Sequence, residues 1–318
     1  MTHSQDATKT IRAAIRAADQ ALVAEHPWTG RDDAVALGAF ALAVLASCGI
    51  GVAWWLGALP TALAVVGMML TVSVLHELEH DLLHDLYLRN PVARALVLGV
   101  IWLFKGNLDP WTRGPMHRWH HVASGQIDDI EERLIGLGLP WGPQRLLLTF
   151  LTPASLLRHP ALKRAVRARV AAGLRSPDVR AYRIPPGFIL ANAVLFLAPL
   201  AAFVGVAMGQ AWAWPLFVLW ALPNLLRHAA IVTMSSNSHY VGIDRGDVVT
   251  QNQILDHWMF WPLQVFCWNF GATHVLHHFV VRQPFWRRTL VFGRVRQVLV
   301  DNGVRANDLG TFGRANHR

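Results

Sequence analysis

Two long stretches without any charged residue constrain this chain more than any other feature. Residues 34–75 and 184–226 contain no Asp, Glu, Lys or Arg. A helix that crosses a bilayer needs roughly 20 consecutive apolar residues, so each stretch is long enough to cross a membrane twice. The whole chain is 53% hydrophobic and only 15% charged, whereas roughly 25% charged residues is usual for a soluble domain. The sequence therefore excludes a soluble globular protein and predicts an all-α integral membrane protein.

Each uncharged stretch is interrupted once, at residues that favour a turn. Gly57 and Pro60 interrupt the first stretch, and Gly209 interrupts the second. We therefore expect a multi-pass protein with four transmembrane helices, arranged as two hairpins, over residues 34–56, 60–76, 187–208 and 211–234.

The basic residues indicate which ends of these helices face the cytosol. Every Lys and Arg lies near the N-terminus, between residues 89 and 183, or from Arg227 onward. Because basic loops stay cytosolic, both termini and the central segment are predicted to lie in the cytosol, at a bacterial inner membrane. This topology accounts for the formal net charge of +9, so no nucleic acid partner is expected.

We expect a single membrane domain over residues 1–318, divided into five segments. They are a cytosolic or interfacial N-terminal segment, a first hairpin, a central cytosolic segment, a second hairpin and a C-terminal cytosolic segment, over residues 1–33, 34–76, 77–186, 187–234 and 235–318.

Three further segments have the character of structures at a membrane surface. Residues 92–104 are too short to span and predict an interfacial or re-entrant helix. Residues 258–270 are rich in Trp and Phe, which suits the interface. Residues 161–175 predict a basic amphipathic helix on anionic lipid, or an ordinary solvated loop, and residues 8–25 show a weaker form of the same pattern.

Sixteen histidines are present, and many of them fall into three clusters. The clusters read HELEH from His76, HRWHH from His117 and HVLHH from His274. On a helix, residues three or four apart share one face, so each cluster can direct at least two imidazoles to one point. The predicted topology places all three clusters at the cytosolic membrane boundary.

Clustered imidazoles point to metal binding. Neutral imidazole is a nitrogen ligand that suits iron, zinc and copper. The eight clustered side chains exceed the four that complete a structural zinc site. They would suit two metal ions with roughly four or five ligands each.

The order and spacing of the three clusters resemble the histidine boxes HxxxH, HxxHH and HxxHH of the integral-membrane fatty acid desaturase superfamily. The resemblance covers essentially the whole chain and implies a cytosolic helical cap that carries a histidine-rich di-iron site. It implies nine metal ligands, with one supplied just after the fourth helix: His76, His80, His117, His120, His121, His239, His274, His277 and His278.

The resemblance also implies an activity, which is O₂-dependent oxidation of an unactivated C–H bond in a long hydrocarbon chain. Desaturation of a fatty-acyl substrate in lipid metabolism is the first hypothesis. Hydroxylation of an acyl or alkyl chain is the alternative, and carotenoid oxygenases share the same boxes. Two iron ions are the implied cofactors, with O₂ as co-substrate.

The chain contains no sequence signature of an electron carrier. It has only two cysteines, Cys48 and Cys267, which we interpret as inert buried thiols, and it has no Gly-rich nucleotide motif. Electrons are therefore expected from a separate ferredoxin-, rubredoxin- or cytochrome-type donor with its reductase. The basic cytosolic face, including Arg164, Arg167 and Arg169, suits an acidic donor.

Other residues near the boxes are weaker candidates. Additional metal ligands, or partners that orient the ligand imidazoles, are His84, His257, Glu77, Asp81 and Asn237. An acidic substrate head group has candidate partners in Lys105, Arg113 and Arg118. Acidic residues after the second box could also orient ligand imidazoles or form a solvated run; they are Asp128, Asp129, Glu131 and Glu132. We interpret Glu131 and Glu132 as solvated. His228, near the membrane end of the fourth helix, is expected to be a packing or interface residue.

A competing hypothesis uses the first cluster alone. Residues 76–80 read HExxH, the zinc-protease helix in which the glutamate is the general base, so an intramembrane zinc protease is a distant alternative. That hypothesis leaves at least five clustered histidines without a role. A membrane metal-binding protein without catalytic activity is a third hypothesis.

Overall fold

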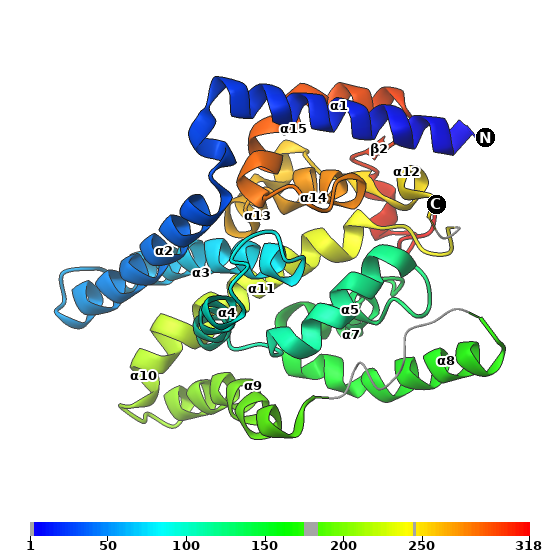
Figure 1. Cartoon of the computed structure of the whole chain (residues 1–318). Coiled ribbons are helices and arrows are strands. Elements are labelled where there is room, and N and C mark those ends of the chain that lie inside the picture. The colour runs from blue at the N-terminus through cyan, green and yellow to red at the C-terminus, as the bar shows by residue number, and fades with distance from the viewer. Residues whose placement is uncertain (1–2, 175–183, 244–245) are drawn as a thin grey trace.

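The computed structural model describes residues 3–174, 184–243 and 246–318. These residues form a mainly helical chain with one two-stranded parallel sheet (Figure 1). The elements, in chain order, are α1 (His3–Glu25), η1 (Pro27–Gly30), α2 (Asp32–Trp55), α3 (Thr61–Leu83), α4 (Pro91–Lys105), α5 (Pro110–Ala123), α6 (Ile130–Leu134), α7 (Pro143–Phe150), η2 (Thr152–Leu157), α8 (His159–Ala171), α9 (Pro186–Ala207), α10 (Ala213–Leu216), η4 (Phe217–Ala221), α11 (Leu222–Ser238), α12 (Val248–Gln251), β1 (Gln253–Ile254), η5 (Trp258–Phe260), α13 (Trp261–Gln264), η6 (Val265–Cys267), α14 (Phe270–Phe279), α15 (Phe285–Asp301), β2 (Arg305–Ala306) and η7 (Leu309–Phe312).

Four helical segments in the described part of the chain are long and apolar enough to cross a membrane. They are α2, α3, α9 and the continuous run α10–η4–α11, residues 213–238. Large apolar side chains on them are open to the surroundings, such as Leu42 at 70% and Leu190 at 75% exposure. Such exposure disfavours an aqueous environment and suits lipid. The predicted all-α membrane fold is confirmed.

Two of the four predicted helices are longer than expected at their C-terminal ends. The second extends to Leu83 instead of residue 76, and the fourth extends to Ser238 instead of residue 234. Polar side chains on these added turns are buried: Glu79 and Asp81 on α3, and Asn237 on α11. The sequence boundaries were short because these residues are polar, yet they are covered by other helices of the protein.

The short apolar segment before the second histidine cluster forms α4, which is followed by α5 after a 93° bend. The Asn90 side chain accepts hydrogen bonds from the first backbone N–H groups of α4, and Asp109 does the same for α5. At the bend, Gly106 has φ +59°, and a Cβ there would lie 2.1 Å from the Trp220 ring. A bent pair of this kind is a broken span or a re-entrant loop, and the second of these is one of the two forms predicted for this segment.

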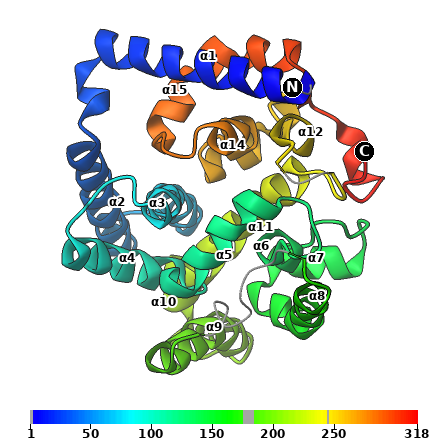
Figure 2. The ribbon, with the colours of Figure 1, turned by 45° about the vertical axis from the view of Figure 1, so that its right-hand side comes forward.

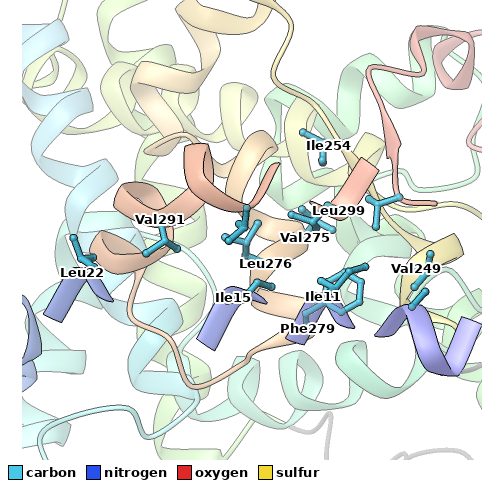
Figure 3. Close-up of a cluster of buried hydrophobic side chains, with 13 residues drawn as sticks. Ile11, Ile15, Leu22, Val249, Ile254, Val275, Leu276, Phe279, Val291 and Leu299 are labelled. Carbon is cyan, nitrogen blue, oxygen red and sulfur yellow. The ribbon is translucent and has the colours of Figure 1, made fainter. Parts of the chain in front are cut away.

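Helix α1 lies beside α15 and over α14 (Figure 2). Its apolar face, including Ile11, Ile15 and Leu22, is buried against Leu276 of α14 and Val291 of α15 (Figure 3). The predicted amphipathic helix is present, but its apolar face packs inside the protein, so the prediction that this face lies on lipid is wrong.

Helix α8 also differs from expectation. Leu162 and Val166 are buried in a cluster with Met116 and Ile130, so much of its apolar side packs on protein. Only Val170 and Leu174 remain exposed from the predicted lipid-facing row. Arg175, the last residue of the predicted helix, lies outside the described residues.

Two smaller predictions, on the cysteines and on the aromatic segment, can be compared with the structure. Cys267 is buried as predicted, whereas Cys48 is exposed on the outer face of α2. Trp258 and Trp261 are 72% and 69% exposed, as an interfacial aromatic segment requires.

The contact between α1 and α15 predicts a stability effect. Ile15 is fully buried, so Ile15→Ala should destabilise the fold by about 2–5 kcal/mol through lost burial and a residual cavity. Thermal unfolding of the detergent-solubilised protein should show a lower Tm. The exposed Gln20→Ala on the same helix serves as the control, and equal Tm values for the two variants would contradict the packing of α1.

Candidate metal centre

Eight imidazoles from four parts of the chain converge in two groups of four. The first imidazole group contains His80, His84, His117 and His277, and the second contains His120, His239, His274 and His278. Within each group the ligand nitrogens all lie within 4.8 Å of one another. The two groups are adjacent, since the ring of His121 beside the first group lies 4.5 Å, between centroids, from that of His278.

Helical spacing distributes these side chains between the two groups. His80 and His84 are one turn apart at the C-terminal end of α3, so both reach the first imidazole group. On α5, His117 points to the first group and His120 to the second. On α14, His277 belongs to the first group, and His274 and His278 belong to the second.

Helix α14 enters the site through an unusual turn. Trp268 and Asn269, directly before it, have φ values of 50° and 59°. Gly271, in the first turn of α14, lies close to the backbone of Leu255. A Cβ atom at position 271 would be 2.9 Å from the Leu255 carbonyl oxygen. A larger residue at 271 would push α14, and with it three of the clustered imidazoles, away from α11 and β1.

The nitrogen atoms approach one another as ligands around a cation would. His239 Nε2 and His278 Nε2 each lie 3.1 Å from His274 Nε2, and His277 Nε2 lies 3.0 Å from both His84 Nε2 and His121 Nε2. Burial, reinforced by neighbouring imidazoles, lowers the pKa of His239, His274, His277 and His278 well below the ordinary value. Neutral imidazoles with converging nitrogens fit a metal.

Carboxylates contact the Nδ1 atoms of two of these imidazoles and so orient the rings. His117 Nδ1 lies 2.7 Å from Glu131 Oε2, and His120 Nδ1 lies 3.0 Å from Asp129 Oδ2. A carboxylate at Nδ1 holds the proton there and leaves Nε2 free to bind a metal.

The prediction that Glu131 and Glu132 are solvated is wrong. The Glu131 side chain is only 14% exposed, and Glu132 is buried and accepts a hydrogen bond from Ser235 Oγ at 2.6 Å. Burial raises the pKa of Glu132 to about 7. Burial would also raise the pKa of Glu131, but His117 and Arg113 more than offset it and hold that pKa well below its usual range. In the sequence, the four closely spaced acids after the second histidine box are typical of a solvated turn. Only the packing of α6 on α5 in the tertiary structure covers them.

Glu77 and Asp81 both contact Arg288, and Asp81 Oδ1 also lies 3.6 Å from His80 Nδ1. Arg288 Nη2 lies 3.5 Å from Glu77 and 3.1 Å from Asp81, while its Nη1 lies 2.9 Å from His277 Nδ1. Asp81 also accepts the Phe285 N–H. Sequence reasoning missed Arg288, which carries no local motif and reaches the site only because α15 packs on α3.

Three other sequence candidates lie outside the two imidazole groups. His76 borders the cavity described below, and its buried Nδ1 has no hydrogen-bond partner in the described chain. His257 accepts the Met259 N–H at the start of η5. Asn237 donates to the Thr233 carbonyl and accepts from the buried Arg145, so its contacts are structural.

The HExxH hypothesis gains no geometric support. A zinc protease requires both histidines of the motif on one metal, with the glutamate free to act as the base. Here His80 belongs to the first imidazole group without His76, and Glu77 pairs with Arg288.

The candidate head-group residues have defined partners. Lys105 forms a buried ion pair with Glu79, and Arg113 lies 3.3 Å from Glu79 and 2.9 Å from Glu131. The exposed Arg118 donates to the Leu83 carbonyl at 3.0 Å. Arg113 borders the first of the two cavities described below, and Lys105 borders the second.

Two cavities share part of their lining, and the first of them borders the imidazoles. The first, of about 600 Å³, is bordered by His76, His80, His117 and His274 at one end and by apolar residues of α6, α7, α9 and α11. The second, of about 540 Å³, is lined mainly by apolar residues of α7, α9 and α11. Apolar cavities of this size suit a small hydrophobic ligand.

The Glu131 carboxylate, which contacts His117 Nδ1, provides a test of the site. Glu131→Ala should weaken metal binding about 10- to 100-fold, because the imidazole loses the partner that fixes its orientation. Metal content after dialysis against graded chelator measures the effect. Glu25→Ala, at an exposed ion pair with Arg294, should match the unaltered protein. Equal metal retention in both variants would mean that Glu131 does not support a ligand.

Comparison with known proteins agrees with this geometry. The profile of the family described as Fatty acid desaturase matches residues 53–310, which include all three histidine boxes and both imidazole groups. No curated protein matches the chain significantly. The family match covers most of the sequence, and the chain therefore belongs to the fatty acid desaturase family.

Proposed function

We propose that this protein oxidises an unactivated C–H bond in a long fatty-acyl chain, with desaturation as the reaction. The observation that carries the proposal is the pair of adjacent four-imidazole groups, three of whose members also border an apolar cavity. The family match supports oxidation of a fatty-acyl substrate as the general activity.

In this proposal the two imidazole groups hold two iron ions. His121 is a further ligand of the first group, because its Nε2 lies 3.2 Å from His84 Nε2. His76, outside the two groups, remains a proposed ligand from the family resemblance. Iron supplies the reduction of O₂ and the abstraction of hydrogen from carbon that side chains alone cannot perform.

The side chains around the metals have supporting tasks. Glu131 and Asp129 keep His117 and His120 in the tautomer that binds metal. Arg288 joins Glu77 and Asp81 to His277 and so ties α3, α14 and α15 together. The apolar walls of the first cavity, such as Ile231 and Phe270, hold a hydrocarbon chain and exclude water from the site.

We propose that residues 1–318 form one domain in a bacterial inner membrane, with two hairpins and with both termini and the boxes in the cytosol. The proposal rests on the distribution of basic residues. In Figure 1 the turns after α2 and α9 lie to the left, away from α14 and α15. A cytosolic site is accessible to a separate electron donor of the ferredoxin, rubredoxin or cytochrome type.

Product analysis tests the reaction. Cells that express the protein should accumulate an acyl product that lacks two hydrogens, detected by mass spectrometry of lipids and free fatty acids. His120→Ala should abolish it, because the second imidazole group loses a ligand, whereas the exposed His26→Ala should leave it unchanged. A product with one added oxygen would replace desaturation by hydroxylation. Absence of any oxidised product with a competent donor present would refute the proposal.

The donor surface has its own test. Replacing Arg164, Arg167 and Arg169 by alanine should lower the turnover rate and flatten its dependence on ionic strength, because an acidic donor loses its attraction to α8. Steady-state rates at several salt concentrations measure this, with Arg16→Ala on the exposed face of α1 as the control. Unchanged salt dependence would place the donor elsewhere.

A further inference from the structure

Arg227 is an unusual residue within the fourth apolar segment. It lies on α11, inside the run of residues 213–238 that is apolar enough to span a membrane, and it is only 2% exposed. A charged side chain at such a position is costly unless it has a partner, and it then commonly marks a functional site.

No partner for the Arg227 guanidinium is found in the described part of the chain. Its Nε is buried without a hydrogen-bond partner, and no carboxylate lies within ion-pair distance in the described residues. The nearby acids are already paired: Glu79 with Lys105 and Arg113, and Glu77 with Arg288. Arg227 therefore has no direct counter-ion among the described residues beside the cavities.

Arg227 lies where the two cavities meet. It borders both of them, together with Asn107, Phe196 and His228. The buried Nε2 of His228 also has no hydrogen-bond partner in the described chain. Two unsatisfied nitrogen groups therefore face a space that is otherwise mainly apolar, and this space leads on one side to the imidazoles.

We propose that Arg227 binds the carboxylate of a free long-chain carboxylic acid within these cavities, with His228 as a second polar contact. The proposal rests on the proposed function and names its substrate class. A guanidinium and a carboxylate match in charge and geometry and form two parallel hydrogen bonds. One carboxylate gives Arg227 a counter-ion, whereas a hydrocarbon, an alcohol or a neutral thioester leaves it without one.

Anchoring the carboxylate has a consequence for the position of oxidation. The head group is fixed relative to the imidazoles, so the oxidised carbon is set by its distance from the carboxylate and not from the methyl end. Acids of different chain length should therefore be oxidised at the same carbon counted from the carboxyl group.

Ligand binding tests the proposal without requiring turnover. Radiolabelled palmitate and palmityl alcohol share one hydrocarbon chain, and their Kd values are measured on the full-length purified protein in nanodiscs. Arg227→Gln should weaken palmitate binding about 10- to 100-fold, as expected for a lost charge-assisted hydrogen bond. Binding of palmityl alcohol should stay unchanged, Arg227→Lys should restore part of the loss, and the exposed Arg294→Gln should have no effect.

The outcomes separate this proposal from the proposed function. Equal weakening of both ligands by Arg227→Gln would show that Arg227 is structural and would overturn the proposal, as would unchanged palmitate binding. If the Gln variant fails to fold, the unaltered protein decides, because equal affinity for palmitate and palmityl alcohol refutes a carboxylate site. Arg227-dependent binding without any oxidised product would retain the site and refute the oxidation. An oxidised product together with Arg227-independent palmitate binding would retain the proposed oxidation and refute the Arg227 site.

Discussion

The convergence of eight imidazoles in a buried site is the constraint on which the rest of this structure depends. Nitrogen lone pairs held about 3 Å apart repel unless a proton or a cation lies between them, and burial makes protonation costly. The arrangement is therefore suited to metal ions. Helices α3, α5, α11 and α14 must meet at fixed angles to supply these groups, and the bend before α5 and the close approach at Gly271 both serve that meeting.

A second layer of charged residues makes this meeting stable. Glu131 and Asp129 lie behind imidazoles of α5, and Arg288 joins α3 to α14. Each of these ions is buried or nearly so and has an opposite charge or an imidazole beside it, as burial of charge demands. Arg227 differs, because its counter-ion is missing from the described chain, and this difference distinguishes a ligand-binding group from a structural one.

Much of this organisation could be predicted before the fold was known. The uncharged stretches located all four apolar helices to within a few residues at most ends, and the three boxes contain eight of the ten proposed ligands. His84 ranked low because it lies one turn beyond its box, yet it belongs to the first imidazole group. Glu131 and Glu132 were misjudged because local sequence does not show which acids another helix will cover.

The sequence by itself determined the membrane class, the helical architecture and the identity of most metal-binding candidates, because hydrophobic length and histidine spacing are local properties of the chain. Only the tertiary structure decided how the imidazoles divide between two groups, which carboxylates support them, and that Arg288 and Arg227 reach the site. These properties depend on contacts between segments far apart in the chain, such as α3 with α15, and no local pattern specifies such contacts.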